Sequence, residues 1–427
     1  MSARRSERGG SALALVLVLL MGLGLALLYS HGALIFEQRS SAQQVRATLA
    51  LHAAEAGRDW AIALLNHPGA IDASCAPANA SPSSPGAPAS GLRERYLATD
   101  PATGLTGPAV AARPGCVHAG GTRWTCSCPA SGDAALSAAD PATLPGDQPA
   151  FAVAFSRGPQ PGSLRLAVTG CSGIGSAGGS ACGGTAAVDA RVDLRQLLQA
   201  QGALRRLPSA ALVSAGPVAV GASTTLVNGD PSSGGLTVQG GAGVTVDPLA
   251  RLLPPAGRAP ADSIVAGDAS LGGSGDAPWR HWFGLSESAL RALPTWQRLG
   301  CPGSCSADQV SAALDAGHRA LWLDGALQVS SEVTWGSDAR PVLLVVRGAV
   351  QLNGPMRLRG LLIATSVQWQ QSASGSARLQ GAVVSLGSSS LSGPVELVRD
   401  AAILQRLREL PGAYLPVPGS WQDFDNR

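Results

Sequence analysis

Eight cysteines are the residues of this chain with the clearest capacity for chemistry. Their number is even, and they lie in segments rich in Gly, Pro and Ser, which is typical of disulfides formed in an oxidising compartment. Loop spacing predicts a Cys171–Cys182 pair around "SGIGSAGGSA" and a Cys301–Cys305 pair in "CPGSC", before a helix that begins with a Ser306/Gln309 capping box. The remaining four allow three pairings, which stay open: Cys75, Cys116, Cys126 and Cys128.

The same cysteines raise the question of a metal. Cys126 and Cys128 in "WTCSC" have a C-x-C spacing, but no second pair and no histidines follow at zinc-finger spacing. No D-x-D-x-D-G loop suggests calcium. We therefore predict no metal site and no cofactor.

Side chains suited to catalysis are scattered. The six histidines are dispersed, "SLGSSSLSGP" lacks a G-x-S-x-G elbow, and the glycine-rich "GCSGIGSAGGSACGG" has no lysine. The acids from residue 321 to residue 400 form no repeated ladder that would hold a pair of carboxylates; they are Asp324, Glu332, Asp338, Glu396 and Asp400. The sequence predicts no enzyme. The net charge of +3 comes from scattered arginines without lysine, so no nucleic-acid partner is expected.

The N-terminal 66 residues predict a long helix that would have to carry any exported head. Arg4, Arg5 and Arg8 precede an apolar run over residues 12–28, which is long enough to predict a single inner-membrane pass with the head in the periplasm. No proline occurs before Pro68. Apolar residues then recur at helical spacing, predicting a stem helix over residues 11–66; they are Val45, Leu49, Ala53, Ala56, Trp60 and Leu64.

Two stretches of this region resemble PilX-type minor pilins, which take part in type IV pilus assembly. They are "RGGSALALVLVLL" and the later "LHAAEAG" around Glu55. The resemblance implies that prepilin peptidase removes a leader over residues 1–10, cutting after Gly10 and leaving Ser11 as the mature N-terminus; Gly9 is an off-by-one alternative. Major pilins carry a glutamate at mature position five, where this chain has Leu15. That departure favours a minor subunit near the pilus tip.

Beyond the stem, the sequence divides into two head regions and a tail. Residues 67–205 are expected to form a pilin-like head, with strands near Phe151, Ser163 and Ala186, of which the first two alternate with period two. Residues 206–400 are short aliphatic runs punctuated by glycine, and the phrase Gly-Ala-Leu/Val recurs at Gly325, Gly348 and Gly381. This pattern predicts a β-helix or solenoid, with a flattened sandwich as the rival. Residues 401–427 are taken as a tail; "VELVRDAAILQRL" and "VPGSW" resemble the ending of a domain joined to PilX-type stems.

A helical insertion is expected over residues 277–318 of the second region. Its aromatic residues either plug the open end of the solenoid or contact a ligand or a partner pilin; they are Trp279, Trp282, Phe283 and Trp296.

Together these features predict an α+β protein with a long pilin helix, a small antiparallel pilin-like sheet and a solenoid-like all-β domain. The expected function is that of a minor pilin in a priming or tip complex. Its partners would be other minor pilins, the pilus assembly platform, prepilin peptidase and the inner membrane. A pilus-tip adhesin, a type II secretion pseudopilin and an unassembled membrane-anchored periplasmic protein remain alternatives.

Overall fold

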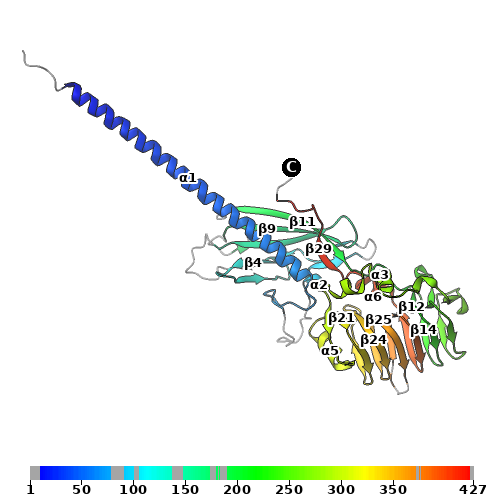
Figure 1. The fold of residues 1–427 in the computed structure, drawn as a ribbon. Helices are drawn as coiled ribbons and strands as arrows, with labels where there is room; N and C mark the ends of the chain where they lie inside the picture. Colours follow the sequence, from blue (N-terminus) through cyan, green and yellow to red (C-terminus); the bar gives the residue numbers. More distant parts are fainter. Residues whose placement is uncertain are drawn as a thin grey trace, which may run out of the picture.

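The computed structural model describes residues 10–77, 91–100, 105–136, 148–173, 179–180, 182, 190–371, 375 and 377–423. Arg4, Arg5, Arg8 and Gly9 of the predicted leader lie outside these residues. The chain begins with one helix, α1 (Gly10–Leu65), and continues mainly as strands. At about 1.5 Å per residue, its 56 residues give a rod of about 84 Å. Figure 1 shows the first half of this rod projecting away from the rest of the molecule.

The C-terminal part of α1 packs on an antiparallel sheet of order β29-β11-β9-β8-β4-β5. Its strands are β4 (Gly115–His118), β5 (Trp124–Ser127), β8 (Ala150–Arg157), β9 (Ser163–Cys171), β11 (Arg191–Gln201) and β29 (Ala413–Pro416). Three small pairs and a helix border it: β1 (Leu97–Thr99) with β2 (Thr106–Pro108), β3 (Ala112–Arg113) with β6 (Gly132–Asp133), β7 (Ala135–Leu136) with β10 (Gly179–Ser180), and α2 (Leu92–Tyr96). The edge strand β29 comes from the far end of the chain.

Residues 210–399 form a coil of parallel strands, which we call the parallel coil. One turn of the coil is a rung with three faces, and each rung hydrogen-bonds in register to the next. The strands of the first three rungs are β12 (Ala210–Ser214), β13 (Val218–Val220), β14 (Thr225–Val227), β15 (Leu236–Gly240), β16 (Val244–Val246), β17 (Arg251–Leu253) and β18 (Ile264–Val265). Those of the later rungs are β19 (Gln297–Leu299), β20 (Ser304–Ser306), β21 (Ala320–Leu323), β22 (Ala326–Val329), β23 (Val333–Trp335), β24 (Val342–Leu352), β25 (Met356–Gln370), β26 (Ala377–Ser385), β27 (Ser389–Ser392) and β28 (Val395–Arg399).

The order of the rungs in space differs from their order in the sequence. The last rung pairs with the first, because β26, β27 and β28 lie beside β12, β13 and β14. The segment after β18 returns to the opposite end, where β19 and β20 begin a second stack. Along the coil in Figure 1 the colours accordingly run from yellow through orange and red to green. The stack is thus a circular permutation of a simple coil.

Glycine is required at the corner of the rung where Gly360 and Gly381 stack on each other. A Cβ on Gly360 would lie 1.9 Å from the carbonyl oxygen of Val342, and one on Gly381 would lie 1.8 Å from that of Gly360. Gly381 also has a φ of +133°, which side-chain-bearing residues rarely adopt. Gly325 and Gly348 stack at a different corner, so the recurring sequence phrase marks two corners of the rung.

One face of the parallel coil is buried on both sides. The interior contains one apolar cluster, including Trp335 and Trp369. The outer surface of the face formed by β12, β21 and the first part of β24 is covered by three helices, and its strands are consequently apolar at consecutive positions. The covering helices are α3 (Ala277–Phe283), α4 (Glu287–Arg291) and α6 (Ala401–Leu407).

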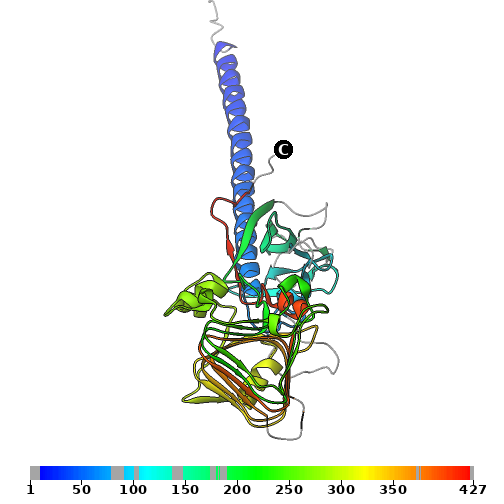
Figure 2. The same cartoon turned by 90° about the vertical axis from the view of Figure 1, so that its right-hand side faces the viewer.

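The insertion therefore has two roles, and only one is a plug. Its first part, with α3 and α4, covers the side of the coil. Its last helix, α5 (Ala307–Asp315), joins the interior cluster through Ala307, Val310 and Ala313. Figure 2 shows this yellow helix within the outline of the coil. The predicted Ser306/Gln309 capping box is present at its start.

The predicted fold class is wrong. The described chain is not an α+β protein built as a long pilin helix with a pilin-like head: after one N-terminal helix it is mostly β, and the other helices span only five to nine residues. Nor are residues 401–427 a simple tail, since they supply α6 and β29. The reason is that a stem pattern is local, whereas the head's topology depends on pairings between distant segments.

Candidate assembly interface

The projecting part of α1 is the most unusual surface of the described molecule. Ten large apolar side chains between Leu13 and Leu25 are each 53–72% exposed, and they occupy every side of the helix. Nothing lies within 4 Å of a Cβ built on Gly22 or Gly24. Soluble monomers rarely leave so large a continuous apolar area uncovered, so this segment has the character of an interaction surface.

The expected membrane pass is corrected by the structure. Among the described residues, no helix supplies the length of apolar sequence, roughly 20 residues, that the ~30 Å core of a bilayer requires. The prediction of an inner-membrane, single-pass location is therefore wrong on this finding.

Small residues hold the other half of α1 tightly against the sheet. Ala50, Ala54 and Ala61 are fully buried there. A Cβ on Gly170 of β9 would lie 2.2 Å from the carbonyl oxygen of Ala50, and one on Gly57 would lie 2.7 Å from the ring of Phe151. Helix and strand backbones can approach this closely only without a side chain between them. The exposed segment is thus a rigid extension of a firmly docked helix.

A buried polar cluster fixes the lower end of the stem to the C-terminal strand. The amide of Asn66, directly after α1, donates to the carbonyl oxygen of Tyr414 at 2.9 Å and accepts from its backbone N–H at 2.8 Å. Arg93 of α2 donates to Asn66 Oδ1 at 2.9 Å and to the carbonyl oxygen of Leu65, and its guanidinium stacks 4.6 Å from the centre of the Tyr414 ring. We call these residues the stem latch.

Burial sets the ionisation of the stem latch. It lowers the pKa of Arg93, with the nearby Tyr414 and Glu409 opposing the shift. It raises the pKa of Tyr414 to about 12, so the phenol stays neutral. The latch is therefore a cation held by a π face and by carbonyl oxygens, and it ties both ends of the head to the stem.

Four disulfides brace the head. The structure pairs Cys171 with Cys182 and Cys301 with Cys305, as predicted, and it resolves the open choice as Cys75–Cys128 and Cys116–Cys126. Because Cys126 and Cys128 enter different disulfides, the C-x-C motif has no free thiolate to offer a metal. Among the described residues, no group of three or more His, Cys, Asp or Glu side chains is placed to bind one.

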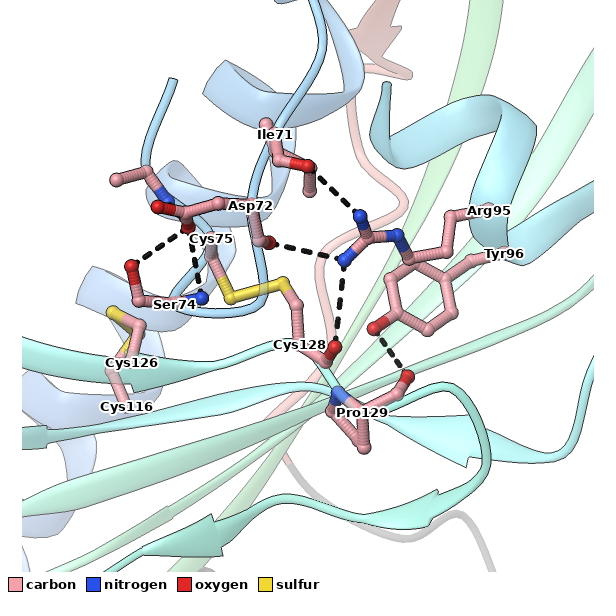
Figure 3. Close-up of a disulfide and its surroundings, with 11 residues drawn as sticks. Ile71, Asp72, Ser74, Cys75, Arg95, Tyr96, Cys116, Cys126, Cys128 and Pro129 are labelled. Atoms are coloured by element: carbon pink, nitrogen blue, oxygen red, sulfur yellow. Dashed lines mark hydrogen bonds between the residues drawn. A yellow bond between two sulfur atoms is a disulfide. The ribbon is translucent and has the colours of Figure 1, made fainter. Parts of the chain in front are cut away.

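The Cys75–Cys128 disulfide lies in a well-bonded loop below the stem (Figure 3). Asp72 accepts hydrogen bonds from the backbone N–H and hydroxyl of Ser74, and these bonds lower the pKa of its carboxyl against the effect of desolvation. Arg95 donates to the carbonyl oxygens of Ile71 and Asp72 at 2.8 and 3.1 Å. In the sequence, only the cysteines indicated this bracing. Nothing in it indicated that Arg95 would take part.

The aromatic residues proposed for ligand or partner contact are buried. Trp279, Trp282, Phe283 and Trp296 are at most 5% exposed. The ring centres of Trp279 and Trp296 lie 5.2 and 5.5 Å from that of Trp322 on β21. These side chains attach the insertion to the coil and leave little ring surface exposed, so their contact with a ligand or a partner stays a prediction.

The residues predicted for leader processing lie at the start of α1. Gly10 is its first residue and Ser11 its second, and Leu15 follows within the exposed segment with 65% of its surface accessible. In comparisons with protein-family models, curated proteins and solved structures, nothing matches this chain.

Proposed function

We propose that this chain is a minor pilin that takes part in type IV pilus assembly, in a priming or tip complex. The observation that carries the proposal is the apolar segment Leu13–Leu25, which extends beyond the head with all of its sides exposed. In the proposed complex, the helices of other minor pilins cover this segment. Such packing gains about 1.5–3 kcal/mol for each leucine that becomes fully buried.

The head supports a place at the tip. It combines an antiparallel sheet with a parallel coil and is much wider than the helix that carries it (Figure 1). Along a shaft of closely packed helices, heads of this size would collide. The tip is the position at which a single copy needs room on one side only.

Leader removal is part of the proposal and has its own test. Prepilin peptidase would cut between Gly10 and Ser11, and the mature N-terminus would be found by mass spectrometry in strains with and without the peptidase. A Gly10→Val variant should keep its leader, whereas Gly22→Val, which alters a glycine with open space around it, should still be processed. An intact leader on the native chain in the presence of the peptidase contradicts the proposal.

The decisive experiment removes apolar surface from the stem without touching the head. A Leu17→Gln/Leu20→Gln variant changes residues that are 60% and 61% exposed, so the fold should be unaffected. We expect co-purification with other minor pilins and the number of pili per cell to fall at least about tenfold, since roughly 3 kcal/mol or more of packing is lost. Leu249→Gln is the matched control because Leu249 is 74% exposed on the coil. Normal pilus numbers with the stem variant would refute the assembly role.

A further inference from the structure

A groove of about 890 Å³ separates α2 and β1 from the loop after β23 and from α6. Its volume lies within the range of protein sites that enclose small ligands or short segments of a chain. It opens beside the stem latch, since Arg93 and Tyr414 contribute to its wall. None of the predicted site residues lines it.

The charge in this groove is unbalanced. Four arginines and two glutamates line it, which leaves a formal excess of two positive charges. They are Arg93, Arg319, Arg340, Arg406, Glu94 and Glu409. The carboxylate of Glu409 already accepts hydrogen bonds from two hydroxyl groups, that of Thr106 at 2.6 Å and that of Thr99 at 3.2 Å.

Two of the arginines share one carboxylate. Glu94 Oε1 pairs with Arg319, and Glu94 Oε2 lies 3.4 Å from Arg340 Nη2. The Nε–H of Arg340 is buried and makes no hydrogen bond to the described residues. Burial, together with the proximity of Arg340, lowers the pKa of Arg319 to about 9. One carboxylate therefore serves two guanidinium groups that repel each other.

Arg406 adds a further cation on the same side of the groove as Arg340. Arg406 of α6 donates to the carbonyl oxygen of Asp338, while the carboxylate of Asp338 pairs with Arg359 at 2.9 Å. Apolar side chains from both sides of the groove line it as well: Leu97, Ala339, Ala402 and Leu410. The groove thus offers both cations and apolar contacts.

We propose that this groove binds an acidic segment of another protein chain, with carboxylate side chains at Arg340 and Arg406 and an apolar side chain against the apolar residues of the groove. Guanidinium groups recognise carboxylates through two parallel hydrogen bonds. The apolar contacts favour a peptide over a small inorganic anion, which would use the arginines alone. The inference goes beyond the proposed assembly role and does not rest on it, because the stem segment takes no part in the groove.

The test measures peptide binding by fluorescence anisotropy with the full chain dispersed in mild detergent. The probe is a fluorescein-labelled peptide that alternates glutamate with leucine, and the comparison peptide replaces each glutamate by glutamine. We expect the acidic peptide to bind at least about tenfold more tightly, equivalent to ~1.4 kcal/mol. Its affinity should decrease with added sodium chloride, because part of the groove is open to solvent.

Substitutions locate the site. Arg340→Gln/Arg406→Gln should weaken binding of the acidic peptide at least about tenfold. Arg406→Gln alone should weaken it less, and it guards against misfolding of the double variant because Arg406 is at the surface. Arg378→Gln removes the same charge from an exposed pair with Glu396 outside the groove, and it should leave binding unchanged.

Three results would overturn the inference. They are equal binding of the glutamine peptide, equal loss of binding in the Arg378→Gln control, and binding of inorganic phosphate or heparin as tight as that of the peptide.

Discussion

Substituting Asn66 by alanine tests whether the stem latch joins the two ends of the chain. Asn66 is 6% exposed, and its amide bonds both backbone groups of Tyr414. It is also one of the acceptors of the buried Arg93 guanidinium. Alanine makes none of these bonds, so the variant leaves an N–H, a carbonyl oxygen and part of a cation without their partner.

The expected cost follows from those bonds. Leaving a buried polar group without its partner costs about 1–3 kcal/mol. With about 1.5 kcal/mol for each backbone group of Tyr414, the local stability of β29 should fall by about 3 kcal/mol. The loss cannot exceed the free energy that holds β29 to β11, because a detached strand regains its hydrogen bonds from water. A change of ~3 kcal/mol corresponds to a roughly 150-fold larger open population.

Native-state hydrogen exchange followed by mass spectrometry reads this change directly. Deuterium uptake by a peptide that covers residues 413–416 should become about 100-fold faster, with the parallel coil unaffected. Gln199→Ala is the control, because Gln199 is on β11 and makes only a 3.4 Å bond to the carbonyl oxygen of Pro161. Unchanged uptake in the Asn66→Ala variant would refute the latch. Equal acceleration throughout the chain would show a general loss of stability instead.

Three further outcomes are expected. Trp279→Ala removes an indole packed 5.2 Å from Trp322, and it should lower the coil's free energy of unfolding by about 3–5 kcal/mol in a urea titration followed by circular dichroism. Removing the Cys75–Cys128 disulfide, which joins cysteines 53 residues apart, should cost about 4 kcal/mol, against about 2 kcal/mol for Cys301–Cys305 with a separation of 4; equal losses would contradict the loop-entropy argument. Burial lowers the pKa of His67 and of His318 in the folded chain, so the unfolded chain takes up protons first on acidification. The contribution of these two histidines to stability should be constant above about pH 6.5 and fall as the pH drops toward their folded-state pKa values, and His318→Gln should reduce that fall in thermal melts.

Local patterns were sufficient for part of the fold. The absence of proline before Pro68 and the helical spacing of apolar residues indicated a helix, and α1 ends at Leu65. The disulfides Cys171–Cys182 and Cys301–Cys305 could be predicted because the two cysteines of each pair are close in sequence. The capping box at Ser306 could be predicted for the same reason, since Ser306 and Gln309 are three residues apart. The β-rich character of the region after Ala210 followed from its aliphatic runs and glycines.

The candidate sites were less accessible. The apolar segment of the stem could be recognised in the sequence. However, no described helix is long and apolar enough to cross a membrane. The aromatic insertion was open to two interpretations, because a run of tryptophans looks the same whether a partner or the chain itself covers it. The groove arginines come from four separate segments, so no single sequence motif contains them.

By itself, the sequence determined the N-terminal helix, the β-rich character of the head and the disulfides that close short loops, since each depends on residues near one another in the chain. Only the tertiary structure decided the permuted order of the coil, the return of β29 to the first sheet and the pairing of Cys75 with Cys128. The physical reason is that every rung presents nearly the same hydrogen-bonding edge. Which edges meet therefore depends on the apolar surface buried by the whole arrangement, and no short stretch of residues encodes that sum.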